Sequence, residues 1–288
     1  MNQQQVSVLP FAKSICVQRG AGIDESIACA QEERCSCLYL ECSYEDGASS
    51  WSSERITHYA RRLRNLDLGV IVHGNYKLPL SHESPEVRAA AVAGVKQEID
   101  LASAFDAPVI VHGSSIFTHR NAKLSRSRAV AAFCESVTAL AVHAERQGVD
   151  LWLENLEFYR DRHPFYTVFS CEEDYAYVLD RVQHTNVRFI LDVGHENVGS
   201  GEPTKVFGRF RERIVAIDMN DNDGTQDSHL GLGRGRVDYA ALLSAMIDCN
   251  WSGHLTLETR GVSVGDDLLF LSQTYERVQR RSEVGLPL

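Results

Sequence analysis

The chain has 288 residues, of which 44% are hydrophobic and 24% are charged, and its formal net charge at pH 7 is −10. These values are typical of a soluble globular protein. No apolar stretch approaches the roughly 20 residues that a membrane-spanning helix needs, and the N-terminus does not resemble a secretory signal. We therefore expect a cytoplasmic protein with no membrane partner. Because nucleic-acid binding draws on basic surface, the acidic balance disfavours a nucleic-acid partner without excluding one.

Eight cysteines are scattered along the chain, and none of them falls in a CxxC pair. A disulfide framework is typical of small secreted proteins, and structural zinc sites use closely spaced cysteines. We therefore expect free thiols.

Short apolar runs alternate with helix-like segments along the chain. The runs, each of the length of a buried strand, cover residues 13–18, 36–42, 68–74, 108–113, 149–155, 189–195, 214–221 and 254–259. The predicted helices cover residues 24–34, 51–64, 84–104, 123–147, 171–183, 203–211, 238–249 and 266–281. Ser84, Pro85 and Glu86 form a strong helix-start signal.

This alternation predicts a parallel sheet with crossover helices. Eight units in one unbroken chain favour a closed barrel over an open doubly wound sheet, and no GxGxxG motif follows the first run. No low-complexity linker or composition break divides the chain. We therefore predict an α/β fold with a single (β/α)8 TIM barrel domain over residues 1–288.

Polar residues end every apolar run except the first. They are Glu41, His73, His112, Glu154, Asp192, His195, Asp218, Asp221 and Glu258. A buried carboxylate or imidazole is costly unless something binds it. Because the active site of a TIM barrel lies at the C-terminal ends of its strands, these endings predict one shared site rather than separate satisfied core groups.

Four carboxylates stand on four consecutive predicted strands: Glu154, Asp192, Asp218 and Glu258. Converging in one barrel mouth, they would repel one another unless a cation lay among them. Oxygen ligands suit Mn²⁺ or Mg²⁺, which we favour, and the nearby histidines leave Zn²⁺ possible. The pairs Asp192 with His195 and Asp227 with His229 bring further ligands together, so His195, Asp227 and His229 are candidates for a second metal.

The segment 214–259 resembles the last third of the xylose-isomerase-like TIM barrel superfamily, and LENL at 153–156 and LDVGH at 191–195 resemble its strand 5 and strand 6 motifs. That superfamily holds sugar phosphate isomerases and epimerases, dehydratases and endonuclease IV. The resemblance extends over nearly the whole chain. It implies the (β/α)8 fold, a divalent metal, a small sugar-like substrate and possible homo-oligomers.

The resemblance also implies four metal ligands on strands 5 to 8. Glu154, Asp192 and Glu258 match the family pattern, whereas Asp218 stands where the family usually has His. Aspartate can still bind a metal, and an all-carboxylate set shifts the preference towards Mn²⁺ or Mg²⁺. If Asp218 points away from the mouth, the metal site is weakened or lost.

The chemistry that the resemblance implies is proton transfer next to the carbonyl of a sugar, polyol or sugar phosphate. Glu154 and Glu258 would remove and return the proton while binding the metal. The residues expected to contact the substrate are Glu41, His73, His112, His195 and Arg234. The segment 158–171 has the length of a substrate-covering loop. Aromatic residues of predicted loops can pack on a sugar or in the core; they are Trp51, Tyr76, Phe117, Tyr159 and Phe165.

Two alternatives stay open. Endonuclease IV cleaves DNA at abasic sites with three zinc ions, and its ligand pattern is matched at His73, His112, Glu154, Asp192, His195, Asp227, His229 and Glu258. The net charge, the sequence LENLEFY and the sequence VHGSS in place of His-Pro-Gly count against this alternative. A dehydratase of the same superfamily would use the same metal and bases, and nothing in the sequence separates it from an isomerase.

Overall fold

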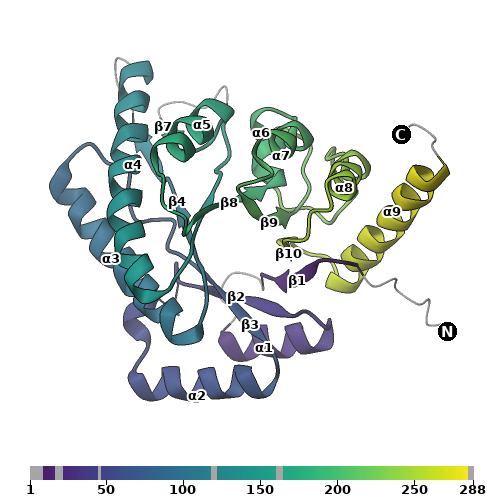
Figure 1. Cartoon of the computed structure of the whole chain (residues 1–288), viewed down its shortest axis with the longest axis horizontal. Coiled ribbons are helices and arrows are strands. Elements are labelled where there is room, and N and C mark those ends of the chain that lie inside the picture. The colour runs from purple at the N-terminus through teal and green to yellow at the C-terminus, as the bar shows by residue number, and fades with distance from the viewer. Residues whose placement is uncertain (1–8, 17–21, 45–46, 118–121, 160–164, 285–288) are drawn as a thin grey trace.

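A computed structural model of the chain describes residues 9–16, 22–44, 47–117, 122–159 and 165–284. Eight parallel strands close into a barrel in the order β1-β10-β9-β8-β6-β4-β3-β2 (Figure 1). They are β1 (Ala12–Ile15), β2 (Cys37–Glu41), β3 (Gly69–His73), β4 (Val109–His112), β6 (Leu151–Glu154), β8 (Val187–Asp192), β9 (Ile214–Met219) and β10 (His254–Leu257). Each predicted apolar run overlaps one of these strands, so the predicted TIM barrel is confirmed.

The predicted helices also form, with ends close to the predicted ones. They are α1 (Ile23–Glu32), α2 (Ser53–Asn65), α3 (Pro85–Phe105), α4 (Ala122–Gln147), α5 (Glu172–Arg181), α7 (Pro203–Phe210), α8 (Tyr239–Asp248) and α9 (Val264–Val284). At the start of α3, the Ser84 side chain accepts a hydrogen bond from the Val87 N–H, and Pro85 occupies the first turn. The sequence signal at residues 84–86 is therefore a true N-terminal cap.

Four short elements were not predicted. Helix α6 (Val193–Gly199) follows β8 directly, and a 3₁₀ turn covers Ala48–Ser50. Strand β5 (Ser115–Phe117) pairs antiparallel with β7 (Phe165–Thr167), so the segment predicted as a covering loop contains a strand. Elements of three to seven residues are too short to show a period, which is why the sequence missed them.

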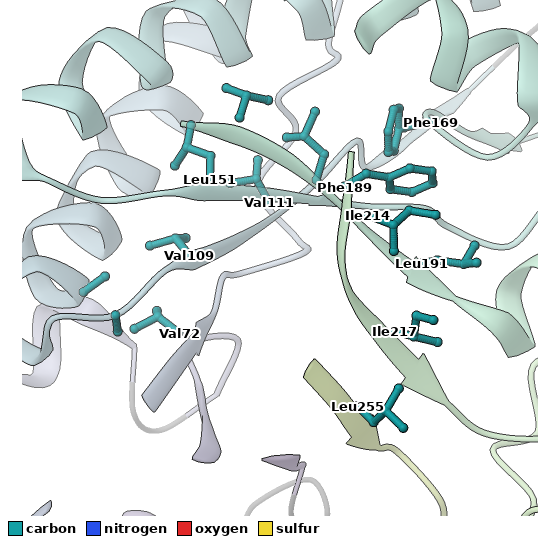
Figure 2. Packing of buried hydrophobic residues seen from close by; sticks show 14 of the residues in the cluster. Val72, Val109, Val111, Leu151, Phe169, Phe189, Leu191, Ile214, Ile217 and Leu255 are labelled. Carbon is teal, nitrogen blue, oxygen red and sulfur yellow. The ribbon is translucent and has the colours of Figure 1, made fainter. Parts of the chain in front are cut away.

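Side chains alternate between the two sides of each barrel strand, as strand geometry requires. Those that point outwards pack under the helices, and Figure 2 labels Val72, Val111, Leu151, Leu191 and Ile217 among them. Those that point inwards form a layer across the barrel: Tyr39, Ile71, Ile110, Trp152, Ile190 and Ala216.

The inward apolar layer shows where the polar residues at the ends of the strands must lie. Each of its members stands two residues before a polar ending, so the ending lies on the same side of the strand, one step nearer the mouth. In this way Glu41 lies above Tyr39, and Glu154 lies above Trp152. The apolar layer closes the barrel below the polar residues, so these side chains meet in a mouth with a packed floor.

Two further expectations concern the whole chain. No helix in the described ranges is long and apolar enough to cross a membrane. All eight cysteines lie in the described ranges and none of them forms a disulfide there, as the scattered spacing predicted.

Glu98 of α3 is a buried carboxyl group that lies outside the barrel mouth. Glu98 is only 3% exposed. Its Oε1 accepts a hydrogen bond of 3.0 Å from the Asn75 N–H, and its Oε2 has no hydrogen-bond partner among the described residues. Burial disfavours the charged form and raises the pKa of Glu98 to about 7. The folded protein therefore holds this proton more tightly than the unfolded chain does.

We expect Glu98→Gln to flatten the dependence of stability on pH. Because the folded pKa lies above the unfolded one, the stabilisation is complete below about pH 4.5 and is lost as the pH rises to about 7, a change of about 3 kcal/mol. The amide cannot ionise, so urea unfolding at pH 5 and pH 8 should give a smaller difference for the variant than for the parent protein. The exposed Glu145→Gln on α4 is the control, and an unchanged pH dependence in Glu98→Gln would show that Glu98 is ionised in the fold.

Candidate metal centre and active site

The barrel mouth gathers the predicted metal ligands into four overlapping groups. Within each group, one ligand atom of every residue lies within 4.8 Å of the others. They are the His73 group (His73, His112, Glu154), the bridging group (Glu154, Asp192, His195), the carboxylate group (Asp192, Asp218, Glu258) and the His229 group (His195, Asp227, His229). Because the groups share members, they form one continuous cluster across the mouth.

Glu154 lies at the centre of this cluster. Its Oε2 is 2.9 Å from Nε2 of His112 and 3.7 Å from Nε2 of His73, and its Oε1 is 3.5 Å from Nδ1 of His195. Burial opposes ionisation, but the three histidines outweigh it and lower the pKa of Glu154 to about 2. Glu154 is thus a carboxylate that faces three imidazoles.

The half-buried Glu41 and the buried His73 form a second pair at the edge of the mouth. Nδ1 of His73 lies 3.0 Å from Oε2 of Glu41, while the other oxygen, Oε1, accepts a hydrogen bond from the Ser43 N–H. Burial opposes both charges, but their mutual attraction outweighs it: the pKa of Glu41 falls to about 2 and that of His73 rises to about 10. Glu41 therefore holds one nitrogen of His73 and leaves Nε2 directed at Glu154.

Asp192 is fixed by the start of α6 and by two asparagines. It caps the helix, because the His195 N–H donates to its Oδ1 at 2.7 Å. The Asn220 Nδ2 donates to both carboxylate oxygens at 3.2 and 3.0 Å. The Asn155 Nδ2 donates to the Asp192 carbonyl oxygen, and the Asn155 Oδ1 accepts a hydrogen bond from the Asp192 N–H. The D-x-x-H spacing is thus a helix cap that presents a carboxylate and an imidazole together.

Asn155 and Asn220 were not predicted as site residues. Their positions in the sequence could have identified them, because Asn155 directly follows Glu154 and Asn220 stands two residues after Asp218. Both are completely buried. Burying an amide is costly unless its hydrogen bonds are made, and Asn155 makes both of its bonds with the Asp192 backbone. Asn220 spends its Nδ2 on the Asp192 carboxylate, while its Oδ1 has no hydrogen-bond partner among the described residues.

Asp218 points into the mouth and lies opposite Asp192 in the register of β8 and β9. Its Oδ1 accepts a hydrogen bond of 2.6 Å from the Tyr39 hydroxyl, and its Oδ2 has no hydrogen-bond partner among the described residues. Burial, followed by the charges of Glu258 and Glu154, raises the pKa of Asp218 well above its usual range. Burial and Glu154 likewise raise the pKa of Glu258 to about 7.

These residues fit a divalent cation. The carboxylates of Glu154, Asp192, Asp218 and Glu258 are buried close to one another, and a free buried oxygen of Asp218 faces the cluster. A cation among them would offset both the burial cost and the mutual repulsion. The set of oxygen donors suits Mn²⁺ or Mg²⁺, while the His73 and His229 groups carry the nitrogen donors that Zn²⁺ accepts.

The His229 group forms the opposite side of the mouth. Oδ2 of Asp227 lies 2.8 Å from Nε2 of His229 and 3.6 Å from Nε2 of His195. Nδ1 of His229 is 2.6 Å from the Glu258 carbonyl oxygen and therefore donates to it, which leaves Nε2 for Asp227. Glu157, which the sequence analysis missed, lies 3.9 Å from Nε2 of His195. Burial, opposed by the charge of His195, raises the pKa of Glu157.

The other predicted residues lie away from the cluster or act structurally. Asp221 is completely buried and binds backbone N–H groups of the loop that follows it. Arg234 in that loop is exposed, and its charge acts on Asp267 of α9. Its predicted contact with substrate stays a prediction.

The predicted aromatic residues divide between core and mouth. Trp51 packs against Tyr59 and Phe105, with ring centroids 5.7 and 5.5 Å apart, so it belongs to the core. The ring of Tyr76 lies 6.3 Å from that of His112, and the Tyr159 hydroxyl accepts a hydrogen bond from the Asp227 N–H. The side chains of the remaining two, Phe117 and Phe165, lie outside the described part of the chain.

The first strand also contributes to the mouth, although its run has no charged ending. Burial, together with the charges of Glu258 and Glu41, raises the pKa of the Cys16 thiol well above its usual range. Cys16 follows β1 directly, so all eight strands of the barrel end near the cluster in a group that can ionise.

The chain is similar to several known proteins. Fructoselysine 3-epimerase of Escherichia coli O157:H7 is 24% identical over 143 residues, which are 50% of this chain and 50% of that protein. The match thus spans about half the length of that curated relative. A D-tagatose 3-epimerase-like protein superposes with a TM-score of 0.81 at 17% identity, covering 94% of this chain and 100% of that one.

A second solved structure, of D-psicose 3-epimerase in the presence of D-fructose, superposes with a TM-score of 0.70 at 15% identity, over 95% of this chain and 99% of the other. Identities this low establish a shared fold. Residues 37–276 match the family described as xylose isomerase-like TIM barrel. That match spans most of the chain and includes all the residues of the candidate ligand groups, and the chain therefore belongs to the xylose isomerase-like TIM barrel family.

Proposed function

We propose that this protein is a divalent-metal-dependent isomerase or epimerase that acts on a sugar by proton transfer next to a carbonyl. The observation that carries the proposal is the convergence of Glu154, Asp192, Asp218 and Glu258 from four consecutive barrel strands. The sugar 3-epimerases among the similar proteins support the same chemistry. A small-molecule sugar, polyol or sugar phosphate is the proposed substrate, while a cytoplasmic location and homo-oligomers stay predictions.

Glu154, Asp192, Asp218 and Glu258 would hold the metal, with Mn²⁺ or Mg²⁺ favoured over Zn²⁺. When bound, such a cation polarises carbonyl and hydroxyl oxygens and so makes an adjacent C–H bond more acidic. Asn155 and Asn220 keep Asp192 in place, because their hydrogen bonds leave it no other orientation.

The proton would move between substrate carbon and the carboxylates of Glu154 and Glu258. These two side chains come from β6 and the end of β10, and therefore reach the mouth from different sides of the barrel. One carboxylate accepts a proton from the substrate and the other returns a proton. The result is an inverted configuration at the carbon in an epimerase, or a carbonyl group moved to the neighbouring carbon in an isomerase. His195 and His112 carry donors that can bind substrate hydroxyl groups, and Glu41 keeps His73 directed at the mouth.

We expect Glu258→Gln to abolish proton exchange. In D₂O with Mn²⁺, the parent protein should introduce deuterium into D-tagatose, D-psicose or D-fructose, and the variant should do so about 10²- to 10⁴-fold more slowly because the amide cannot accept the proton. Nuclear magnetic resonance of the recovered sugar measures the exchange. Glu145→Gln, an exposed residue of α4, is the control and should exchange at the parental rate. Exchange at an undiminished rate in Glu258→Gln would refute its role as a base.

A second candidate function is phosphodiester hydrolysis at several metal ions. The specific observation in its favour is that the His73 group, the His229 group and the carboxylate group have no residue in common, so that each could hold a separate metal ion. Metal analysis of protein prepared without chelator separates the two functions: about one ion per chain supports the isomerase. Three zinc ions per chain together with cleavage of an abasic DNA duplex would favour the hydrolase. A dehydratase would release water from the sugar in the same exchange assay.

A further inference from the structure

Asp218 is one of the four carboxylates in the mouth, and its surroundings differ from those of the other three. One of its oxygens is bound by a tyrosine hydroxyl, and the other is free of hydrogen bonds from the described residues. The tyrosine, Tyr39, comes from β2, so the contact joins strands that are not neighbours in the barrel. A contact across the inside of the barrel requires that the two side chains together span the distance between their strands.

The hydrogen bonds around Tyr39 have a fixed direction. The Thr256 hydroxyl donates to the Tyr39 oxygen at 3.0 Å, and the Tyr39 hydroxyl donates to Oδ1 of Asp218 at 2.6 Å. Tyr39 is 3% exposed, and Thr256 and Asp218 are completely buried, so water does not compete for these bonds. The ring of Tyr39 lies 5.6 Å from that of His73, which restricts its orientation further.

We infer that Tyr39 is a positioning residue for the metal: it occupies Oδ1 of Asp218 and so presents Oδ2 as a single, oriented oxygen ligand. This inference rests on the proposed metal site. Histidine offers one nitrogen at a fixed angle, whereas a free carboxylate can bind with one oxygen or two. The hydrogen bond from Tyr39 makes the aspartate act as a one-atom ligand. The atom that Asp218 offers is an oxygen, whereas a histidine would offer a nitrogen. The arrangement therefore favours Mn²⁺ over Zn²⁺ relative to a histidine at the same place.

The test is a titration of metal-stripped full-length protein with Mn²⁺ alone, followed by the electron paramagnetic resonance signal of free Mn²⁺. Tyr39→Phe should weaken Mn²⁺ binding about 10- to 100-fold, as is typical when a group that orients a ligand is lost. The same titration with Zn²⁺ should also show weaker binding, because the lost hydrogen bond orients the Asp218 ligand for either cation. Thr256→Val, which removes only the bond that orients the hydroxyl, should weaken Mn²⁺ binding by a smaller factor.

A matched control is Tyr175→Phe. Tyr175 is also completely buried and donates to a buried carboxylate, Oε2 of Glu196, at 2.8 Å, but that pair lies outside the metal cluster. Its loss should lower thermal stability without changing Mn²⁺ affinity. A purely structural role for Tyr39 predicts that the two phenylalanine variants behave alike.

The decisive measurement is a double-mutant cycle with Asp218→Asn. If Tyr39 acts through Asp218, adding Tyr39→Phe to Asp218→Asn should cost much less Mn²⁺ affinity than it costs the parent protein. Parental Mn²⁺ affinity in Tyr39→Phe, or an equal loss in both backgrounds, would overturn the inference and leave the metal site itself standing. Absence of Mn²⁺ binding by the parent protein would overturn both the inference and the proposed metal-dependent function.

Discussion

Glu154→Gln should remove metal binding and turnover together. Glu154 belongs to two of the four ligand groups, and its carboxylate faces His73, His112 and His195 at 2.9 to 3.7 Å. The amide keeps the shape but loses the charge and one acceptor oxygen, so the cation loses a ligand and the three imidazoles lose their shared partner. We expect sugar exchange to fall about a thousandfold or more, since a ligand and a base are lost at once.

Glu154→Gln, like Glu258→Gln, removes a proposed metal ligand and a proposed base, and it also removes the shared partner of three imidazoles. Metal content measured by mass spectrometry should fall in Glu154→Gln, and excess Mn²⁺ should not restore exchange. The His112 side of the mouth should also change, because Nε2 of His112 can no longer donate to a carboxylate. Full metal content with parental exchange in Glu154→Gln would contradict the proposed centre, whereas Glu145→Gln should resemble the parent protein in both measurements.

Asp221→Ala should destabilise the fold more than any other single change considered. The Asp221 carboxylate is completely buried and accepts hydrogen bonds from the backbone N–H groups of Asn222, Gly233, Gly235 and Val237, at 2.9 to 3.1 Å. These bonds fold the loop between β9 and α8 onto the barrel. Leaving several buried N–H groups without an acceptor should lower the free energy of unfolding by about 4 kcal/mol.

Gly235 of that loop explains how the backbone comes so close to the Asp221 carboxylate. A Cβ on Gly235 would lie 2.3 Å from both Oδ1 of Asp221 and the Asn222 carbonyl oxygen, so the backbone can approach the carboxylate only as glycine. Urea unfolding measures the effect, with the exposed Asp223→Ala in the same loop as the control. Asp221→Asn, which keeps one acceptor oxygen, should fall between the two. A variant Asp221→Ala as stable as Asp223→Ala would show that water replaces the carboxylate.

The sequence by itself determined the barrel, the strand ends and the candidate ligands. These features depend on local patterns: apolar runs of strand length, helices of regular period between them, and polar residues at the ends of the runs. Glu154 and Asp192 follow from that pattern because side chains of a strand alternate, and the residue two places beyond an inward apolar one also points inwards. Glu258 follows from its place at the end of the last apolar run. The helix cap at Ser84 was equally local and equally predictable.

Only the tertiary structure decided which of these residues meet and what holds them. A register shift between β8 and β9 sets Asp192 opposite Asp218, and no local pattern encodes register. Tyr39 reaches Asp218 from 179 positions away, and His229 is held by the carbonyl of Glu258, so neither contact has a sequence period. Asp221 carries the same polar strand-end signal as the metal ligands but binds backbone N–H groups instead. The type of a residue fixes what it can bind, and the packing of distant strands fixes what it does bind.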